Sequence, residues 1–191
     1  MRHRTRRRSA GRYARLRPGS HPGRSILLVL TPPRPGISPW HPAALLATWF
    51  GSGLLPKAPG TWGSLAALPF AWGLGLVGGW PLLLASSLAC FVVGWWAVAI
   101  YVRRTGADDP SEVVIDEVAG QWLVLAAAPP EPLFYVAGFA LFRFLDITKP
   151  WPAGWADRHV HGGIGVMLDD MLAAVYGAAL VALIALWGAL P

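Results

Sequence analysis

The sequence predicts an all-α membrane protein: a compact bundle of about three to four hydrophobic helices with its polar loops at one membrane face. Three observations support this. The 191-residue chain is 54% hydrophobic and only 14% charged, whereas soluble domains average about 25% charged residues. Its long apolar runs lack the alternation of apolar and polar positions that strands show. Its 11 Trp residues lie mostly near the ends of these runs, as aromatic side chains do at bilayer interfaces.

The first helices are predicted in the stretch Ala58–Val102, which contains no charged side chain. One membrane span needs about 20 apolar residues, so this stretch accommodates two. We place them at about 64–77 and 82–102. The sequence Gly-Gly-Trp-Pro at 78–81 is typical of a turn between helices.

Two further apolar blocks follow. The block 118–144 is interrupted by Pro129-Pro130-Glu131-Pro132 and therefore predicts two shorter helices. The glycine-rich run 161–165 is expected to be a flexible loop. The last block, 171–190, has no charged residue and predicts another span.

The net charge of +6 is unevenly distributed. Residues 1–34 hold ten Arg and no acid, whereas all ten acids lie between Asp108 and Asp170. We therefore predict a basic, disordered extension over 1–38 and a helical domain over 39–191. The extension is suited to electrostatic binding of anionic lipid headgroups. The alternatives are nucleic-acid binding and no role at all. Of these, we do not expect a nucleic-acid partner. The single cysteine, Cys90, excludes a disulfide scaffold.

The few charged residues next to the apolar helices mark the candidate site, because a charge near the bilayer centre costs about 2.5–3.5 kcal/mol. In the first cluster Lys57 and Thr61 flank a Pro-Gly pair at a predicted helix start. This is either a phosphate cradle or an ordinary capped turn. In the second cluster Glu112 fits a solvated helix start. Asp116 and Glu117 do not, since apolar residues follow at once.

The third cluster is the richest in charge. Arg143, Asp146 and Lys149 have helical spacing, and the pair Asp169-Asp170 directly precedes the last span. Carboxylate oxygens of this kind suit Mg²⁺, and Mg²⁺ with nearby cations suits attack of water on a phosphate monoester. The alternative is a set of interfacial ion pairs without catalysis.

The chain resembles the phosphatidylglycerophosphatase A family of bacterial membrane phosphatases. The resemblance rests on the segments 50–69, 114–120, 142–152 and 157–170, in that order. It implies Mg²⁺-dependent removal of the terminal phosphate of phosphatidylglycerophosphate, which leaves phosphatidylglycerol. It also implies a site on the cytoplasmic side of the bacterial inner membrane. A non-catalytic membrane interaction protein, and a phosphotransferase acting on another membrane phosphomonoester, remain as alternatives.

The predicted site residues have three roles. Asp116, Glu117, Asp169 and Asp170 are expected to hold Mg²⁺ and to orient a water, which gives Asp116 a catalytic role as well. Asp146 is a further ligand, the general base or a nucleophile that forms an aspartyl phosphate, and His161 protonates the leaving alkoxide. The substrate phosphate is expected to bind Lys57, Thr61, Arg143, Lys149 and Arg158.

Overall fold

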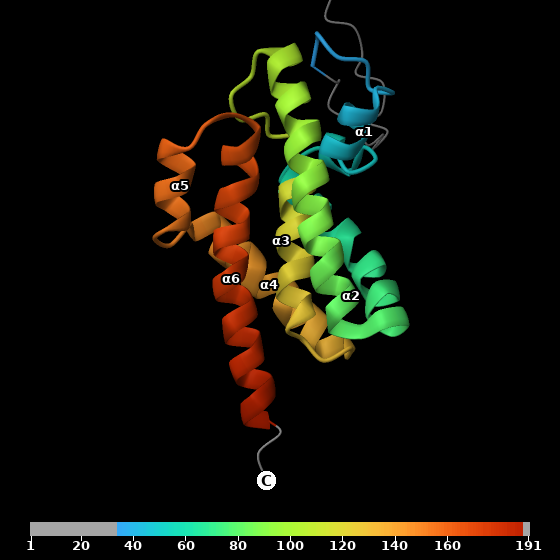
Figure 1. Ribbon diagram of the computed structural model, residues 1–191, viewed down its shortest axis with the longest axis vertical. Helices are drawn as coiled ribbons and strands as arrows, with labels where there is room; N and C mark the ends of the chain where they lie inside the picture. The colour runs from blue at the N-terminus through green and yellow to red at the C-terminus, as the bar shows by residue number, and fades with distance from the viewer. Residues whose placement is uncertain (1–33, 189–191) are drawn as a thin grey trace, which may run out of the picture.

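The computed structural model describes residues 34–188, and in this range it contains six α-helices, a short 3-10 helix and no strand. The predicted all-α class is therefore confirmed for the described residues. The elements are α1 (Pro42–Ala47), η1 (Ser52–Leu54), α2 (Pro59–Thr105), α3 (Ile115–Ala126), α4 (Pro132–Thr148), α5 (Ala153–His159) and α6 (Gly162–Gly188) (Figure 1).

Most of the predicted extension 1–38 lies outside the described residues, so its expected disorder stays a prediction. Its last residues contact the helical domain. The Arg34 guanidinium donates from Nε to Glu112 Oε1 at 2.6 Å, and Ile37 is buried in the core.

Helix α2 is a hairpin of two arms. Gly79 interrupts it with φ 63° and ψ −158°, which is not helical, and only glycine adopts such a conformation easily. The ribbon turns back at this point, at the lower right of Figure 1. The turn predicted at 78–81 is thus confirmed.

The proline-rich break is also confirmed, because α3 ends at Ala126 and α4 begins at Pro132. The prediction of a loop at 161–165 is wrong, since α6 already begins at Gly162. The glycines serve close packing there. A Cβ on Gly163 would lie 2.6 Å from the Ala99 nitrogen of α2, and one on Gly165 would lie 2.1 Å from the Val160 carbonyl oxygen.

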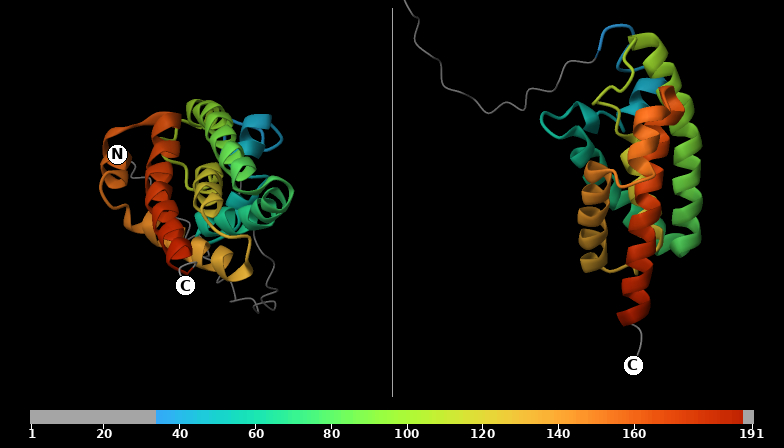
Figure 2. Two further views of the ribbon diagram at one scale, coloured as in Figure 1. Left: turned by 60° about the horizontal axis from the view of Figure 1, so that its bottom comes forward. Right: turned by 90° about the vertical axis from the view of Figure 1, so that its left-hand side faces the viewer.

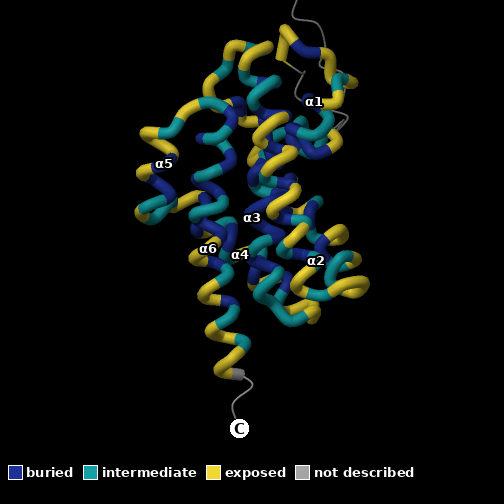
Figure 3. Tube along the Cα trace, viewed as in Figure 1, coloured by how far each residue is buried: buried dark blue, intermediate teal, exposed yellow. Residues whose placement is uncertain are grey.

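Helix α3 lies at the centre of the bundle, between α2 and α6 (Figures 1 and 2). Most of its residues are buried (Figure 3). Side chains tie the hairpin α2 to the helices beside it. Trp122 Nε1 donates to the Ala67 carbonyl at 3.0 Å, and Ser87 Oγ donates to the Ala119 carbonyl at 2.8 Å. These bonds fix the axial position of α3 relative to α2 and therefore the position of the α3 N-terminus.

Two of the described helices, Pro59–Thr105 and Gly162–Trp187, are long and apolar enough to cross a membrane. Only 28% of the most apolar window of each is buried, whereas the core helix of a soluble protein is mostly buried. The exposed side chains are large and apolar, among them Val92, Leu183 and Ile184. The end of α6 projects beyond the other helices (Figure 1).

The directions of the helices gather the charged residues at one end of the bundle. The start of α2, its far end, the loop before α3, the end of α4, all of α5 and the start of α6 lie there (Figure 1). Among the described charged residues, Glu131 alone lies in the loop at the opposite end of α3 and α4. The predicted clustering of polar segments at one face is therefore found in the structure.

Candidate functional site

Three acidic side chains from two helices meet at the centre of the site. Asp116 and Glu117 come from the first turn of α3 and Asp170 from α6, and one oxygen of each lies within 4.8 Å of the others. Gly120 allows this approach, because a Cβ there would lie 2.6 Å from the Phe142 ring and 3.3 Å from the Asp170 carbonyl oxygen.

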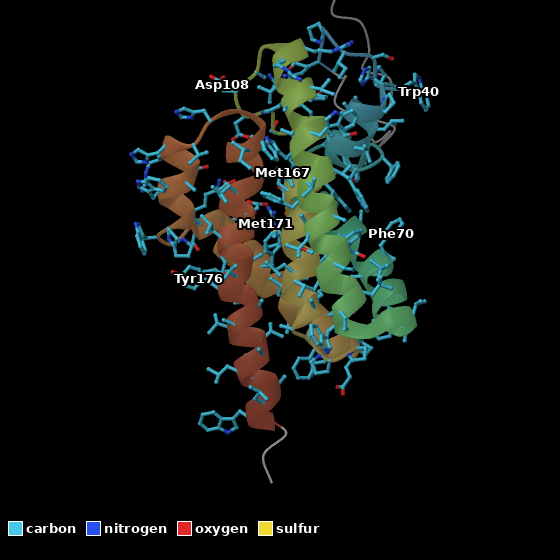
Figure 4. The ribbon with its side chains drawn as sticks, in the orientation of Figure 1. Trp40, Phe70, Asp108, Met167, Met171 and Tyr176 are labelled. Carbon is cyan, nitrogen blue, oxygen red and sulfur yellow. The ribbon has the colours of Figure 1, made fainter. Side chains whose placement is uncertain are left out.

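These acids form one wall of a cavity of about 270 Å³. Along α6 its lining runs from Gly162 to Asp170. Asp169 and Asp170 lie between Met167 and Met171, which are labelled in Figure 4. The walls of the cavity come from the loop before α3, the start of α3, the end of α4, α5 with the residues after it, and the start of α6. The charged and titratable residues of the lining are Asp108, Asp109, Asp116, Glu117, Asp146, Lys149, Asp157, His161, Asp169 and Asp170.

Arg143 of α4 supports the acids from behind. Its Nη1 atom lies 2.6 Å from Asp146 Oδ2 and 3.6 Å from Glu117 Oε1, and all three side chains are nearly buried. The start of α2 reaches the same place. A Cβ on Gly60 would lie 1.9 Å from Glu117 Oε1 and 3.0 Å from Arg143 Nη1. The glycine is therefore needed for the helix start to contact this ion pair.

Lys149 ends α4 in a left-handed conformation, with φ 42°. Its ammonium contacts the carboxylates of Asp157 and Asp169. Burial lowers the pKa of Lys149, but the contacts with these two acids outweigh burial and raise the pKa above its ordinary value. The side chain therefore stays charged and joins Asp157 of α5 to Asp169 of α6.

Negative charge exceeds positive charge in the cavity. Burial, and next the neighbouring Glu117 carboxylate, raise the pKa of Asp116 well above its ordinary value. Three buried carboxylate oxygens have no hydrogen-bond partner among the described residues: Glu117 Oε2, Asp169 Oδ1 and Asp170 Oδ2. Unpaired buried carboxylates are costly. A hard divalent cation takes such oxygens as ligands, so this donor set fits one.

The structure brings most of the predicted site residues together. Those that line the cavity are Asp116, Glu117, Asp146, Lys149, His161, Asp169 and Asp170, and Arg143 contacts two of them. Lys57, Thr61 and Arg158 lie outside the lining, with Lys57 and Arg158 exposed. Their role in binding phosphate stays a prediction.

Two residues have a place that sequence reasoning missed. Glu112, expected to be a solvated residue at a helix start, is only 5% exposed and accepts hydrogen bonds from Arg34 and Tyr101. The expectation was wrong because Glu112 precedes α3, in a loop that packs inward. Gly60 contacts Glu117 and Arg143, and the Pro-Gly pair at a helix start was the signal that pointed to it.

The fold and the site together define a class: an all-helical protein with two helices long and apolar enough to cross a membrane and a buried acidic cluster that could hold a cation. The sequence profile of the family described as Phosphatidylglycerophosphatase A matches residues 45–185. The chain therefore belongs to the phosphatidylglycerophosphatase A family.

The chain is similar to relatives from three bacteria, two of which carry the name of this family. Phosphatidylglycerophosphatase A of Escherichia coli (strain K12) is 43% identical over 145 residues, which are 75% of this chain and 82% of the relative. The protein of the same name from Haemophilus influenzae is 41% identical over 152 residues, 79% and 93% of the two chains. A putative phosphatidylinositol-3-phosphatase of Bacteroides thetaiotaomicron is 41% identical over 150 residues, 75% and 92% of the two chains. No solved structure matches the chain significantly.

Proposed function

We propose that the protein is a Mg²⁺-dependent phosphatase that hydrolyses phosphatidylglycerophosphate to phosphatidylglycerol and inorganic phosphate. The observation that carries the proposal is the acid cluster with three unpartnered oxygens, which lies beside Arg143 and Lys149. Family membership and the names of two relatives support the substrate. We place the enzyme in the bacterial inner membrane with its site on the cytoplasmic side, where basic loops are enriched.

The depth of the site supports a lipid substrate. A Cβ on Gly94 of α2 would contact Met167 at 2.7 Å and Ile115 at 3.3 Å, so Gly94 is level with the acid cluster. The next residues, Trp95 and Trp96, are 46% and 52% exposed. Tryptophan at the surface of a membrane helix favours the interface. These exposed tryptophans support a position of the cluster at the depth of the headgroup phosphates.

An exposed tryptophan also lies near the end of α6, where we place the opposite membrane interface. Trp187, near the end of α6, is 75% exposed. It follows Met167 by 20 residues, or about 30 Å of helix. The hydrocarbon core of a bilayer is also about 30 Å thick. α6 thus has the length to connect a site at one interface with the opposite one.

Asp116, Glu117 and Asp170, with Asp169 beside them, would hold the Mg²⁺ ion. When bound there, the ion would supply Lewis-acid polarisation of the phosphoryl oxygens. Lys149, in the cavity lining, provides fixed positive charge for the phosphoryl group in the transition state, and Arg143 adds positive charge from behind the acids that it contacts.

Two titratable residues complete the proposed reaction. Asp146, held by Arg143, takes the proton of the attacking water as its oxygen bonds to phosphorus. His161, in the cavity lining, donates a proton to the glycerol oxygen as its bond to phosphorus breaks.

The test is phosphate release by the full chain in mixed micelles. Phosphatidylglycerophosphate, phosphatidylinositol 3-phosphate, phosphatidate and glycerol 3-phosphate are compared, each with Mg²⁺ and with EDTA. We expect Mg²⁺-dependent release from phosphatidylglycerophosphate at the highest kcat/KM. Preference for the inositol lipid would reassign the substrate. No release from any ester would favour a non-catalytic protein, and phosphate transfer to an alcohol would favour a phosphotransferase.

A further inference from the structure

Glu112 is a buried acid that the proposed reaction does not use. It lies in the loop between α2 and α3, and its Oε1 atom accepts a hydrogen bond from Tyr101 Oη at 2.9 Å and from Arg34 Nε at 2.6 Å. Its neighbours Ser111 and Val113 line the cavity. The Glu112 side chain is not part of this lining and instead contacts Tyr101 and Arg34.

The backbone of the same loop is held from outside the cavity. A Cβ on Gly53 would lie 2.1 Å from the Glu112 carbonyl oxygen, so the backbone at Gly53 is in direct contact with the loop. Two residues after Glu112, the Val114 N–H donates to the Ala47 carbonyl at 2.9 Å. The loop is therefore fixed to α2, to the segment 47–53 and to Arg34, while its other side faces the site.

This attachment sets the start of α3. Val114 is the N-cap residue of α3 and makes no side-chain capping bond, so the loop and not a local cap fixes the first turn. Asp116 and Glu117 lie in that turn. A shift of the loop moves both carboxylates relative to Asp170, which comes from α6.

We propose that Glu112, with Tyr101 and Arg34, is a positioning residue that holds the α3 acids in register with Asp170 for cation binding. It touches neither cation nor substrate and acts through the loop 108–114. The inference extends the proposed function and depends on it for the cation site. Residues that orient metal ligands typically change metal affinity by about 10-fold to 100-fold when replaced.

The variants are Tyr101→Phe, Glu112→Gln and Arg34→Gln in the full chain. Tyr101→Phe removes one hydroxyl, and the remaining ring fills the same space. This variant should fold normally, so it still tests the inference if Glu112→Gln fails to fold. The matched control is Tyr135→Phe, since Tyr135 is also buried and its hydroxyl donates to the Ala71 carbonyl at 3.3 Å. That bond lies away from the cavity.

Binding of Mn²⁺ alone, followed by electron paramagnetic resonance, is the main readout. We expect the Mn²⁺ affinity of Tyr101→Phe and Glu112→Gln to be about 10-fold lower than that of the wild type. The affinity of Arg34→Gln should fall by a smaller factor, and that of Tyr135→Phe should equal the wild-type affinity. Raising the Mg²⁺ concentration should restore kcat in the first two variants with little change in KM for lipid. Equal Mn²⁺ affinity in Tyr101→Phe and Tyr135→Phe would overturn the inference. A wild-type chain that binds Mn²⁺ but releases no phosphate would overturn the proposed function and leave this inference standing.

Discussion

Replacement of Gly60 by alanine tests the site most sharply. An added Cβ would lie 1.9 Å from Glu117 Oε1, whereas ordinary van der Waals contact begins at 3.4 Å. The carboxylate must therefore move by about 1.5 Å, and misplacement of a reacting group by about 1 Å typically costs about 100-fold in rate. Because the clash is with the end of a flexible side chain, the fold can absorb it while the site cannot.

We expect Gly60→Ala to lower kcat/KM for phosphate release by about 100-fold, or about 2.7 kcal/mol. Thermal unfolding should change little, since alanine favours helix over glycine by up to about 1 kcal/mol.

Gly73→Ala is the matched control, because Gly73 lies in the same arm of α2 and a Cβ there meets nothing within 4 Å. It should keep full activity. If the two variants have the same kcat/KM, Glu117 is not part of the working site and the reasoning fails.

The remaining predictions concern the acids, the cation and the packing of α3. Asp169→Asn and Asp170→Asn should each lower kcat by at least about 100-fold without lowering the unfolding temperature; full activity in both would remove them from the site. Since the pKa of Asp116 is raised, protons compete with the cation, so the apparent Kd for Mg²⁺, measured by calorimetry, should fall as the pH rises through that pKa. A pH-independent Kd would contradict a role for Asp116 as ligand. EDTA should abolish phosphate release and excess Mg²⁺ should restore it; activity that survives EDTA would exclude a cation requirement. Trp122→Phe loses the bond to the Ala67 carbonyl and should destabilise the fold by about 1 kcal/mol in denaturant unfolding, with kcat unchanged at low temperature; a large loss of kcat would show that α3 moves.

Several elements were predictable because their signals are local. The Gly-Gly-Trp-Pro run at 78–81 and the proline-rich run at 129–132 are clusters that favour a break between helices, since glycine adopts positive φ easily and proline lacks an N–H. A single proline is a weaker signal, and Pro69 lies inside α2. The start of α6 was not predictable in this way. Four residues containing three glycines are typical of a loop, yet they are helical here, with Gly163 packed against Ala99 of α2 and Gly165 against Val160.

The site, too, was partly predictable from the sequence and partly dependent on how the helices pack. The scarcity of charge limited the candidates, and most of the acids that sequence patterns selected line one cavity. Asp116 and Glu112 are both acids of one short segment, yet one faces the cation site and the other contacts Tyr101. The apolar residues after Glu117 distinguished Asp116 as a site residue, but no sequence signal predicted that Glu112 is buried against Tyr101.

The sequence by itself determined that this protein is helical, rich in apolar surface and short of charge, and that its acids matter. These properties depend on composition and on breaks that act over a few residues. The tertiary structure decided which acids meet, that Gly60 touches Glu117, and that Glu112 supports the loop from behind. Such contacts join residues of different helices, and their distances follow from how the helices pack.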